Sequence, residues 1–164
     1  MKLFSKDESV KWLNTHGIAL DGRDNPARSS STLEVKRLAL PKEASRLLWL
    51  SRRIESFLCP WTEALFLVSA WGVWRSSENW HLYYKVRQSY GDHQLISDAP
   101  GHLFLNYEAY DLVTFIQLGL LAGWDFGVCT ADDYARAFVS HDEWAEFATK
   151  DGVELAKLET DFTS

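Results

Sequence analysis

His141 stands in the run His141-Asp142-Glu143-Trp144, whose residue types are those of a catalytic or metal-binding cluster. On a helix, consecutive side chains point about 100° apart, so three adjacent polar groups cannot converge on one ion. The run also has no second histidine at the spacing of a helical metal site. Ser140 and Glu143 instead fit a capping box, which predicts a helix from here to about Thr149. Whether His141, Asp142 and Glu143 have a role beyond capping stays open.

Nucleophilic catalysis would need an activated cysteine or serine beside a base. The chain has two cysteines, Cys59 and Cys129, and five histidines that could supply a base. It has no Gly-x-Ser-x-Gly elbow, and neither cysteine lies in a known local signature. We therefore expect both thiols to be small buried apolar groups.

Phosphate and metal sites also lack their usual signatures. The chain contains neither Gly-x-x-x-x-Gly-Lys-Ser/Thr nor Gly-x-Gly-x-x-Gly. Two carboxylate pairs, Asp132 with Asp133 and Glu108 with Asp111, could act in acid–base chemistry or bind Mg²⁺. Turn formation and the helix dipole explain both pairs more simply. We expect no cofactor and no bound metal.

Aromatic residues gather between residues 71 and 90, with basic side chains among them. On a predicted helix, Trp80, Tyr84 and Arg87 share one face, and such a helix cannot bury every ring against one sheet. Trp, Tyr and Arg dominate the hot spots of protein interfaces, whereas ordinary core packing with hydrogen-bonded polar tips is the alternative. The predicted partner-binding residues are Trp74, Arg75, Trp80, Tyr83, Tyr84, Arg87 and Tyr90.

The net charge of −6 is unevenly distributed along the chain. Residues 1–60 carry a net charge of +4, whereas residues 61–164 carry 6 basic and 16 acidic side chains, a net charge of −10. An acidic body repels phosphate backbones, so we expect no nucleic-acid partner. It could recruit a basic protein, although acidity also keeps an aromatic-rich protein soluble.

Helical and strand-like segments alternate along the chain. This order predicts one α/β or α+β domain, with a mixed three- to four-stranded sheet and about five helices. Residues 21–31 are expected to form a polar loop that could move, and residues 152–164 an acidic tail that frays or adds one amphipathic turn. The helices are predicted over 5–17, 43–58, 78–90, 106–122 and 140–149, and the strands over 33–40, 64–74, 124–130 and 134–139.

Short signals mark several ends of these elements. Ser5 and Glu8 fit a capping box at the start of the first helix, and Gly123 is expected to end the helix over 106–122. The strand over 33–40 precedes Pro41 and is expected at an edge of the sheet. The strands over 124–130 and 134–139 are expected to form a hairpin around Asp132 and Asp133.

Length and composition bound the class of protein. A chain of 164 residues can bury one substantial core without disulfides, and two cysteines exclude a disulfide framework. The start has no secretory signal pattern, and no apolar run reaches the 18 or so residues of a membrane span. We therefore expect a cytoplasmic protein with no membrane partner.

These observations favour a non-catalytic protein that binds another protein, in its specific form an immunity- or antitoxin-type inhibitor of a basic partner. One alternative is a hydrolase with a dispersed site, in which His141 or His102 works with a nearby Asp or Glu. Another is a structural subunit that forms homodimers through the aromatic segment. Ionisable groups gathered around one cavity would indicate the enzyme, and an exposed acidic or aromatic face would indicate the inhibitor.

Overall fold

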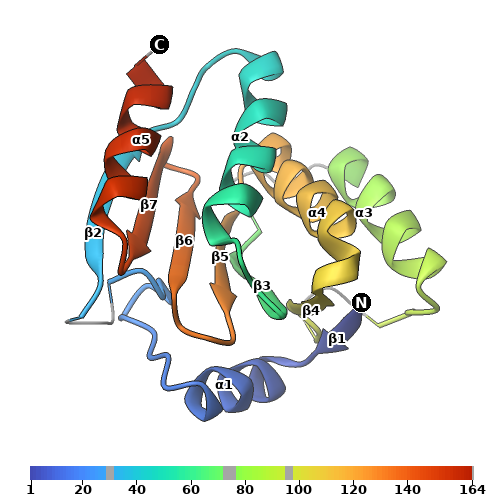
Figure 1. Cartoon of the computed structure of the whole chain (residues 1–164). Helices are drawn as coiled ribbons and strands as arrows, with labels where there is room; N and C mark the ends of the chain where they lie inside the picture. The colour runs from blue at the N-terminus through green and yellow to red at the C-terminus, as the bar shows by residue number, and fades with distance from the viewer. Residues whose placement is uncertain (29–31, 72–76, 95–97, 164) are drawn as a thin grey trace.

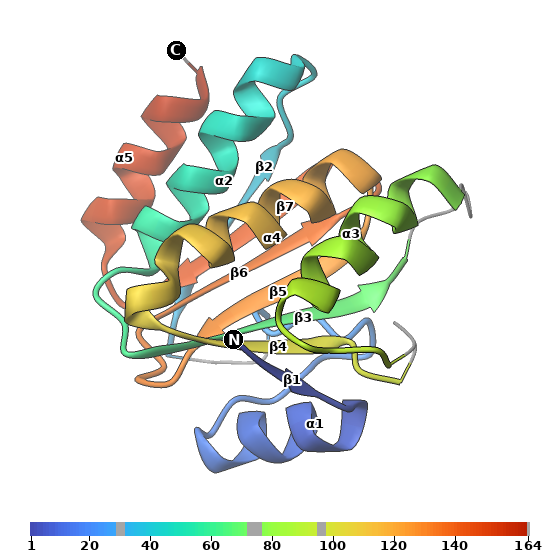
Figure 2. The ribbon, with the colours of Figure 1, turned by 90° about the vertical axis from the view of Figure 1, so that its right-hand side faces the viewer.

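The computed structural model describes residues 1–28, 32–71, 77–94 and 98–163. Within them the strands form one sheet in the order β1-β4-β3-β5-β6-β7-β2 (Figures 1 and 2). The strands are β1 (Lys2–Phe4), β2 (Glu34–Ala39), β3 (Glu63–Ala70), β4 (Gly101–Leu105), β5 (Asp125–Thr130), β6 (Ala135–Ser140) and β7 (Trp144–Thr149). The helices are α1 (Lys6–Thr15), α2 (Ala44–Leu58), α3 (Ser77–Ser89), α4 (Ala109–Ala122) and α5 (Gly152–Thr163), with a short 3₁₀ turn η1 (Asn106–Glu108) before α4.

In the part of the chain that the structure describes, the fold is a single α+β domain with five α-helices, as expected, but the expected sheet of three to four strands of mixed direction is wrong. Among the described residues the sheet has seven strands, and every neighbouring pair is antiparallel. The extra strands are β1, β4 and β7. β1 has three residues, too few for a periodic pattern to be recognised.

The helix predicted from Ser140 to Thr149 is also wrong, because this segment is the β6–β7 hairpin. Ser140 Oγ accepts the backbone N–H of Asp142 at 3.2 Å, and the Ser140 carbonyl accepts the N–H of Glu143 at 3.2 Å. Glu143 has a φ of +63°, a turn conformation that a helix does not allow. The prediction failed because a serine side chain that accepts a nearby backbone N–H can close a tight turn as readily as it caps a helix.

One face of the sheet lies under α2, α3, α4 and α5, which Figure 2 shows side by side. Alternate strand residues point into this core, among them Phe66, Phe126 and Phe147, each at most 1% exposed. Burying one such side chain stabilises the fold by about 1.5–3 kcal/mol. Leu155 and Leu158 of α5 also lie in this core, which is why the acidic end of the chain forms a helix of 12 residues.

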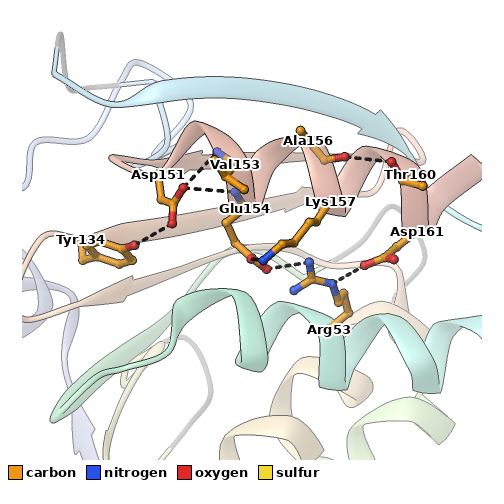
Figure 3. Close-up of polar contacts among 9 residues, drawn as sticks. All are labelled: Arg53, Tyr134, Asp151, Val153, Glu154, Ala156, Lys157, Thr160 and Asp161. Atoms are coloured by element: carbon orange, nitrogen blue, oxygen red, sulfur yellow. Dashed lines mark hydrogen bonds and ion pairs between the residues drawn. The ribbon is translucent and has the colours of Figure 1, made fainter.

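Polar contacts fix α5 against α2 (Figure 3). Asp151 Oδ1 accepts the backbone N–H groups of Val153 and Glu154 at 2.9 and 3.2 Å, which caps the first turn. Arg53 of α2 contacts Glu154 through Nη2 at 2.7 Å and Asp161 through Nε at 2.8 Å. The acidic residues of α5 are therefore partly neutralised by the basic N-terminal third of the chain.

The opposite face of the sheet is covered by α1, which lies apart from the other helices next to β1 (Figure 1), and by residues 16–28 together with Leu33. Residues 16–28 are here called the strap. The strap runs so close to β5 that a Cβ on Gly127 would lie 2.8 Å from the Pro26 ring, which only glycine permits. Asn25 and Ala27 of the predicted polar loop are buried, and the Pro26 carbonyl accepts Arg136 Nη1 at 2.8 Å. The strap is thus part of the folded domain at residues 25–27.

Candidate functional site

The predicted partner-binding residues divide between the interior and the surface. Trp74 and Arg75 lie outside the described residues, and Trp80 lies in α3. Tyr83 and Arg87 are fully buried, Tyr84 is half-buried, and Tyr90 is 36% exposed. Of this set, Tyr90 offers the clearest contact surface in the folded chain.

Tyr83 and Arg87 belong to a polar cluster beneath α3. The Tyr83 hydroxyl lies 2.6 Å from His102 Nε2, and Arg87 Nε donates to Asp92 Oδ2 at 2.7 Å. Burial lowers the pKa of His102 to about 3, and burial raises the pKa of Tyr83 above its ordinary value. His102 is 0% exposed. This ring is therefore a neutral core group that a dissolved substrate cannot reach.

Two other tyrosines are far more exposed, and the sequence-based prediction did not single them out. Tyr107 of η1 is 76% exposed and Tyr110 of α4 is 88% exposed. The Tyr90 hydroxyl interacts with the Asp111 carboxylate in the first turn of α4, and burial together with this carboxylate raises the pKa of Tyr90. We call Tyr90, Tyr107 and Tyr110 the tyrosine surface. The sequence could have indicated Tyr107 and Tyr110, because their positions in the predicted helix 106–122 lie opposite the apolar face of that helix.

The segment that carries Tyr107 and Tyr110 has two carboxylates, one of which is paired with a cation. Residues 103–124 contain no Lys, Arg or His but include Glu108 and Asp111. Glu108 accepts the backbone N–H of Leu105 at 2.9 Å and forms an ion pair with the Met1 ammonium group. Burial would raise the pKa of Glu108, but these contacts outweigh it and lower the pKa. The carboxylate beside the tyrosines therefore stays ionised near neutral pH.

A second site centres on His141, at the turn between β6 and β7. Asp125, at the start of β5, accepts His141 Nδ1 at 2.8 Å and the His141 backbone N–H at 2.6 Å, both on Oδ1. The other ring nitrogen, Nε2, lies 3.5 Å from Asp142 Oδ1. The His141 side chain is 33% exposed. The sequence of residues 140–144 could not predict that His141 pairs with Asp125, because Asp125 is 16 residues away in sequence.

His141 borders a hollow of about 400 Å³ at the ends of four strands. Its walls combine the strap with the ends of β3 and β6 and the starts of β5 and β7. Five ionisable residues therefore share one hollow, a convergence that the sequence did not predict. The lining includes Arg23, Asp24, Asp125, His141, Asp142, Ser69, Ser140, Phe138 and Trp144.

The thiols and carboxylate pairs give no further site. Cys129 is buried as expected, but Cys59 is exposed, contrary to expectation. Burial raises the pKa of Cys59 to about 11 and that of Cys129 to about 12, so both stay protonated near neutral pH. Among the described residues, no three His, Cys, Asp or Glu side chains are grouped so that they could hold a metal ion.

No helix in the described part of the chain is long and apolar enough to cross a bilayer. No protein-family model matches the chain, and neither the curated proteins nor the solved structures include a significant match to it. The geometry of these two sites is therefore the basis for inferring function.

Proposed function

We propose that the protein acts by binding another protein, one that presents a basic surface, through the tyrosine surface. The observation that carries the proposal is the exposure of Tyr107 and Tyr110, at 76% and 88%. A tyrosine ring offers a large apolar contact at a small cost in side-chain entropy, and its hydroxyl can hydrogen-bond a partner. Such residues commonly anchor protein interfaces.

The acidity of the protein favours a partner with a basic surface. The outward face of α4 continues from Tyr110 to Thr114 and Leu121, which are exposed, and residues 103–124 contain no Lys, Arg or His. Of their two carboxylates, Glu108 is paired with the Met1 ammonium group, so the attraction rests on Asp111 and on the net charge of −10 of residues 61–164. A lysine- or arginine-rich surface would be attracted to this charge, which would raise its association rate. The aromatic contacts would then slow dissociation.

In its specific form the proposal is an inhibitor of the immunity or antitoxin type, which masks the active surface of a basic partner. The small single domain, its acidity and the outward tyrosines support this form. It also explains why the aromatic surface is left open in the isolated chain.

The proposal can be tested by photo-crosslinking in the native host. p-Benzoylphenylalanine replaces Tyr110 in one variant and Val153 in a second, because Val153 of α5 is 66% exposed and lies far from Tyr110 in sequence. Illumination of the Tyr110 variant is expected to give one discrete adduct whose crosslinked peptide is rich in Lys and Arg. The Val153 variant is expected to give no such adduct.

Two results would reject the proposal. One is an identical adduct pattern from positions 110 and 153, which would show that the contact is not specific to the tyrosine surface. The other is an adduct at position 110 with a second copy of this chain. That result, together with a concentration-dependent dimer in sedimentation, would assign the surface to homodimerisation instead.

A further inference from the structure

We infer that His141 is a general base and that the hollow beside it hydrolyses small carboxylic esters. This activity is separate from the proposed protein binding and uses a different part of the molecule. It depends on the way Asp125 fixes the ring, on the solvent access of Nε2 and on the composition of the hollow.

Asp125 determines which nitrogen of His141 can act. A carboxylate accepts hydrogen bonds, so the contact of 2.8 Å places the ring proton on Nδ1 and leaves the lone pair on Nε2. The backbone N–H of His141 donates to the same carboxylate oxygen, which fixes the residue at two points. A histidine held on Nδ1 by a carboxylate can act as a base through Nε2 once a water molecule reaches that nitrogen.

The nucleophile at this site is water. Among the described residues, Nε2 has no hydrogen bond to a serine hydroxyl or a cysteine thiol, and its neighbour is Asp142 Oδ1 at 3.5 Å. Asp142 is 60% exposed, so it can move aside when a water molecule takes its place at Nε2. The ring of His141 itself is one third exposed to solvent.

The lining of the hollow indicates the substrate class. Trp144, which packs on the buried Phe138, provides aromatic surface for an apolar acyl or aryl group, and the exposed Arg23 of the strap provides a cation in the lining. A guanidinium group can stabilise the negative charge that develops on a carbonyl oxygen during attack. A volume of about 400 Å³ admits only a small molecule. An alcohol leaves more readily than an amine, so an ester suits one base and one cation better than an amide.

The reaction balances without any further reactant. His141 Nε2 takes a proton from water while the water oxygen bonds to the carbonyl carbon of the ester. The bond from that carbon to the leaving oxygen then breaks, and the imidazolium returns its proton to the leaving alkoxide. One ester and one water give one acid and one alcohol, and the ionised Asp125 stabilises the imidazolium between the two steps.

The test uses the purified full chain with p-nitrophenyl butyrate as the probe. His141→Gln is expected to lower kcat/KM about 100-fold, which is at the lower end of the rate enhancement that a positioned general base provides. Asp125→Asn is expected to lower kcat more than it changes KM, because Asp125 acts chiefly by positioning the ring of His141. His93→Gln is the control, because His93 is exposed and lies outside the hollow, and it should hydrolyse the probe at the wild-type rate.

A chemical experiment covers the case in which a substituted chain fails to fold. Diethylpyrocarbonate is added to the wild-type chain, and carbethoxylation of each histidine is followed by mass spectrometry alongside the hydrolysis rate. The rate is expected to fall in proportion to modification of His141 and not of His93. The inference would be overturned if hydrolysis persisted after His141 was modified, if His141→Gln matched the wild type, or if the wild type were no faster than free imidazole.

Discussion

Arg28 donates from Nε to both carboxylate oxygens of Glu146, at 2.8 Å each, although the two residues are 118 positions apart in sequence. Arg37 Nε donates to Oε1 of the same carboxylate at 2.9 Å, and Asn25 Nδ2 donates to Oε2 at 2.7 Å. Glu146 is 1% exposed. One buried carboxylate on β7 therefore joins the strap and the edge strand β2 to the neighbouring strand of the sheet.

We predict that Glu146→Ala lowers the free energy of unfolding by about 2–4 kcal/mol, because it leaves Asn25 and two arginines without their shared acceptor. Urea unfolding provides the measurement. Glu159→Ala is the matched control, since its pair with Lys36 is about half exposed and should contribute about 1 kcal/mol or less. Equal losses in the two variants would show that the Glu146 cluster does not anchor the strap.

A second prediction concerns pH. Burial lowers the pKa of His102 from 6.5 to about 3, so the unfolded chain binds a proton in this range and the folded chain does not. The stability from His102 is complete above pH 6.5 and is lost as the pH falls toward 3. His102→Gln should therefore show a weaker decrease of melting temperature between neutral and acid pH than the wild type. An imidazole signal of His102 that titrates near 6.5 in the folded chain would contradict this prediction.

Much of the fold could be predicted from the sequence, because local patterns determined it. The capping box of Ser5 and Glu8 is present at the start of α1, with both reciprocal hydrogen bonds formed. Gly123 ends α4 with a φ of +65°, as its position after an apolar helix predicted. The edge strand β2 before Pro41 and the hairpin around Asp132 and Asp133 are also confirmed.

β7 could not be predicted by the same reasoning. Both of its faces are covered, one by the helices and one by the strap, so Ala145, Phe147 and Ala148 are all buried and the period of two is obscured. Glu146 is also buried, because its arginine partners come from distant segments. Only tertiary contacts distinguish this segment from a short helix with a charged residue on its surface.

In the candidate sites, too, local patterns could indicate some residues, whereas others depend on tertiary contacts. Tyr107 and Tyr110 were recognisable in principle, because their spacing places them away from the apolar face of a predicted helix. The pairing of Asp125 with His141 was not, because the segment from Ser140 was predicted to be a helix, whereas His141 lies in the turn between β6 and β7. The burial of Tyr83 likewise depends on where α3 lies on the sheet, which the sequence of α3 does not determine.

A third prediction tests helix capping. Ser5→Ala should lower the free energy of unfolding by about 1 kcal/mol, because it removes the side-chain acceptor for the Glu8 backbone N–H. Ser5→Asp keeps such an acceptor and should retain nearly the wild-type stability. Thermal unfolding followed by circular dichroism checks both variants. If Ser5→Asp were as unstable as Ser5→Ala, the cap would not be the cause of the loss.

The most direct test of the central claim is the affinity of the tyrosine surface for the crosslinked partner, measured by isothermal titration calorimetry with purified proteins. The double variant Tyr107→Ser plus Tyr110→Ser should weaken Kd about 100-fold or more, as expected for two interface anchors. It should leave the free energy of unfolding within about 0.5 kcal/mol of the wild type, since both rings are exposed. Val153→Ser, at another exposed apolar residue, should bind as the wild type does. An unchanged Kd in the double variant, or an equal loss in Val153→Ser, would contradict the account.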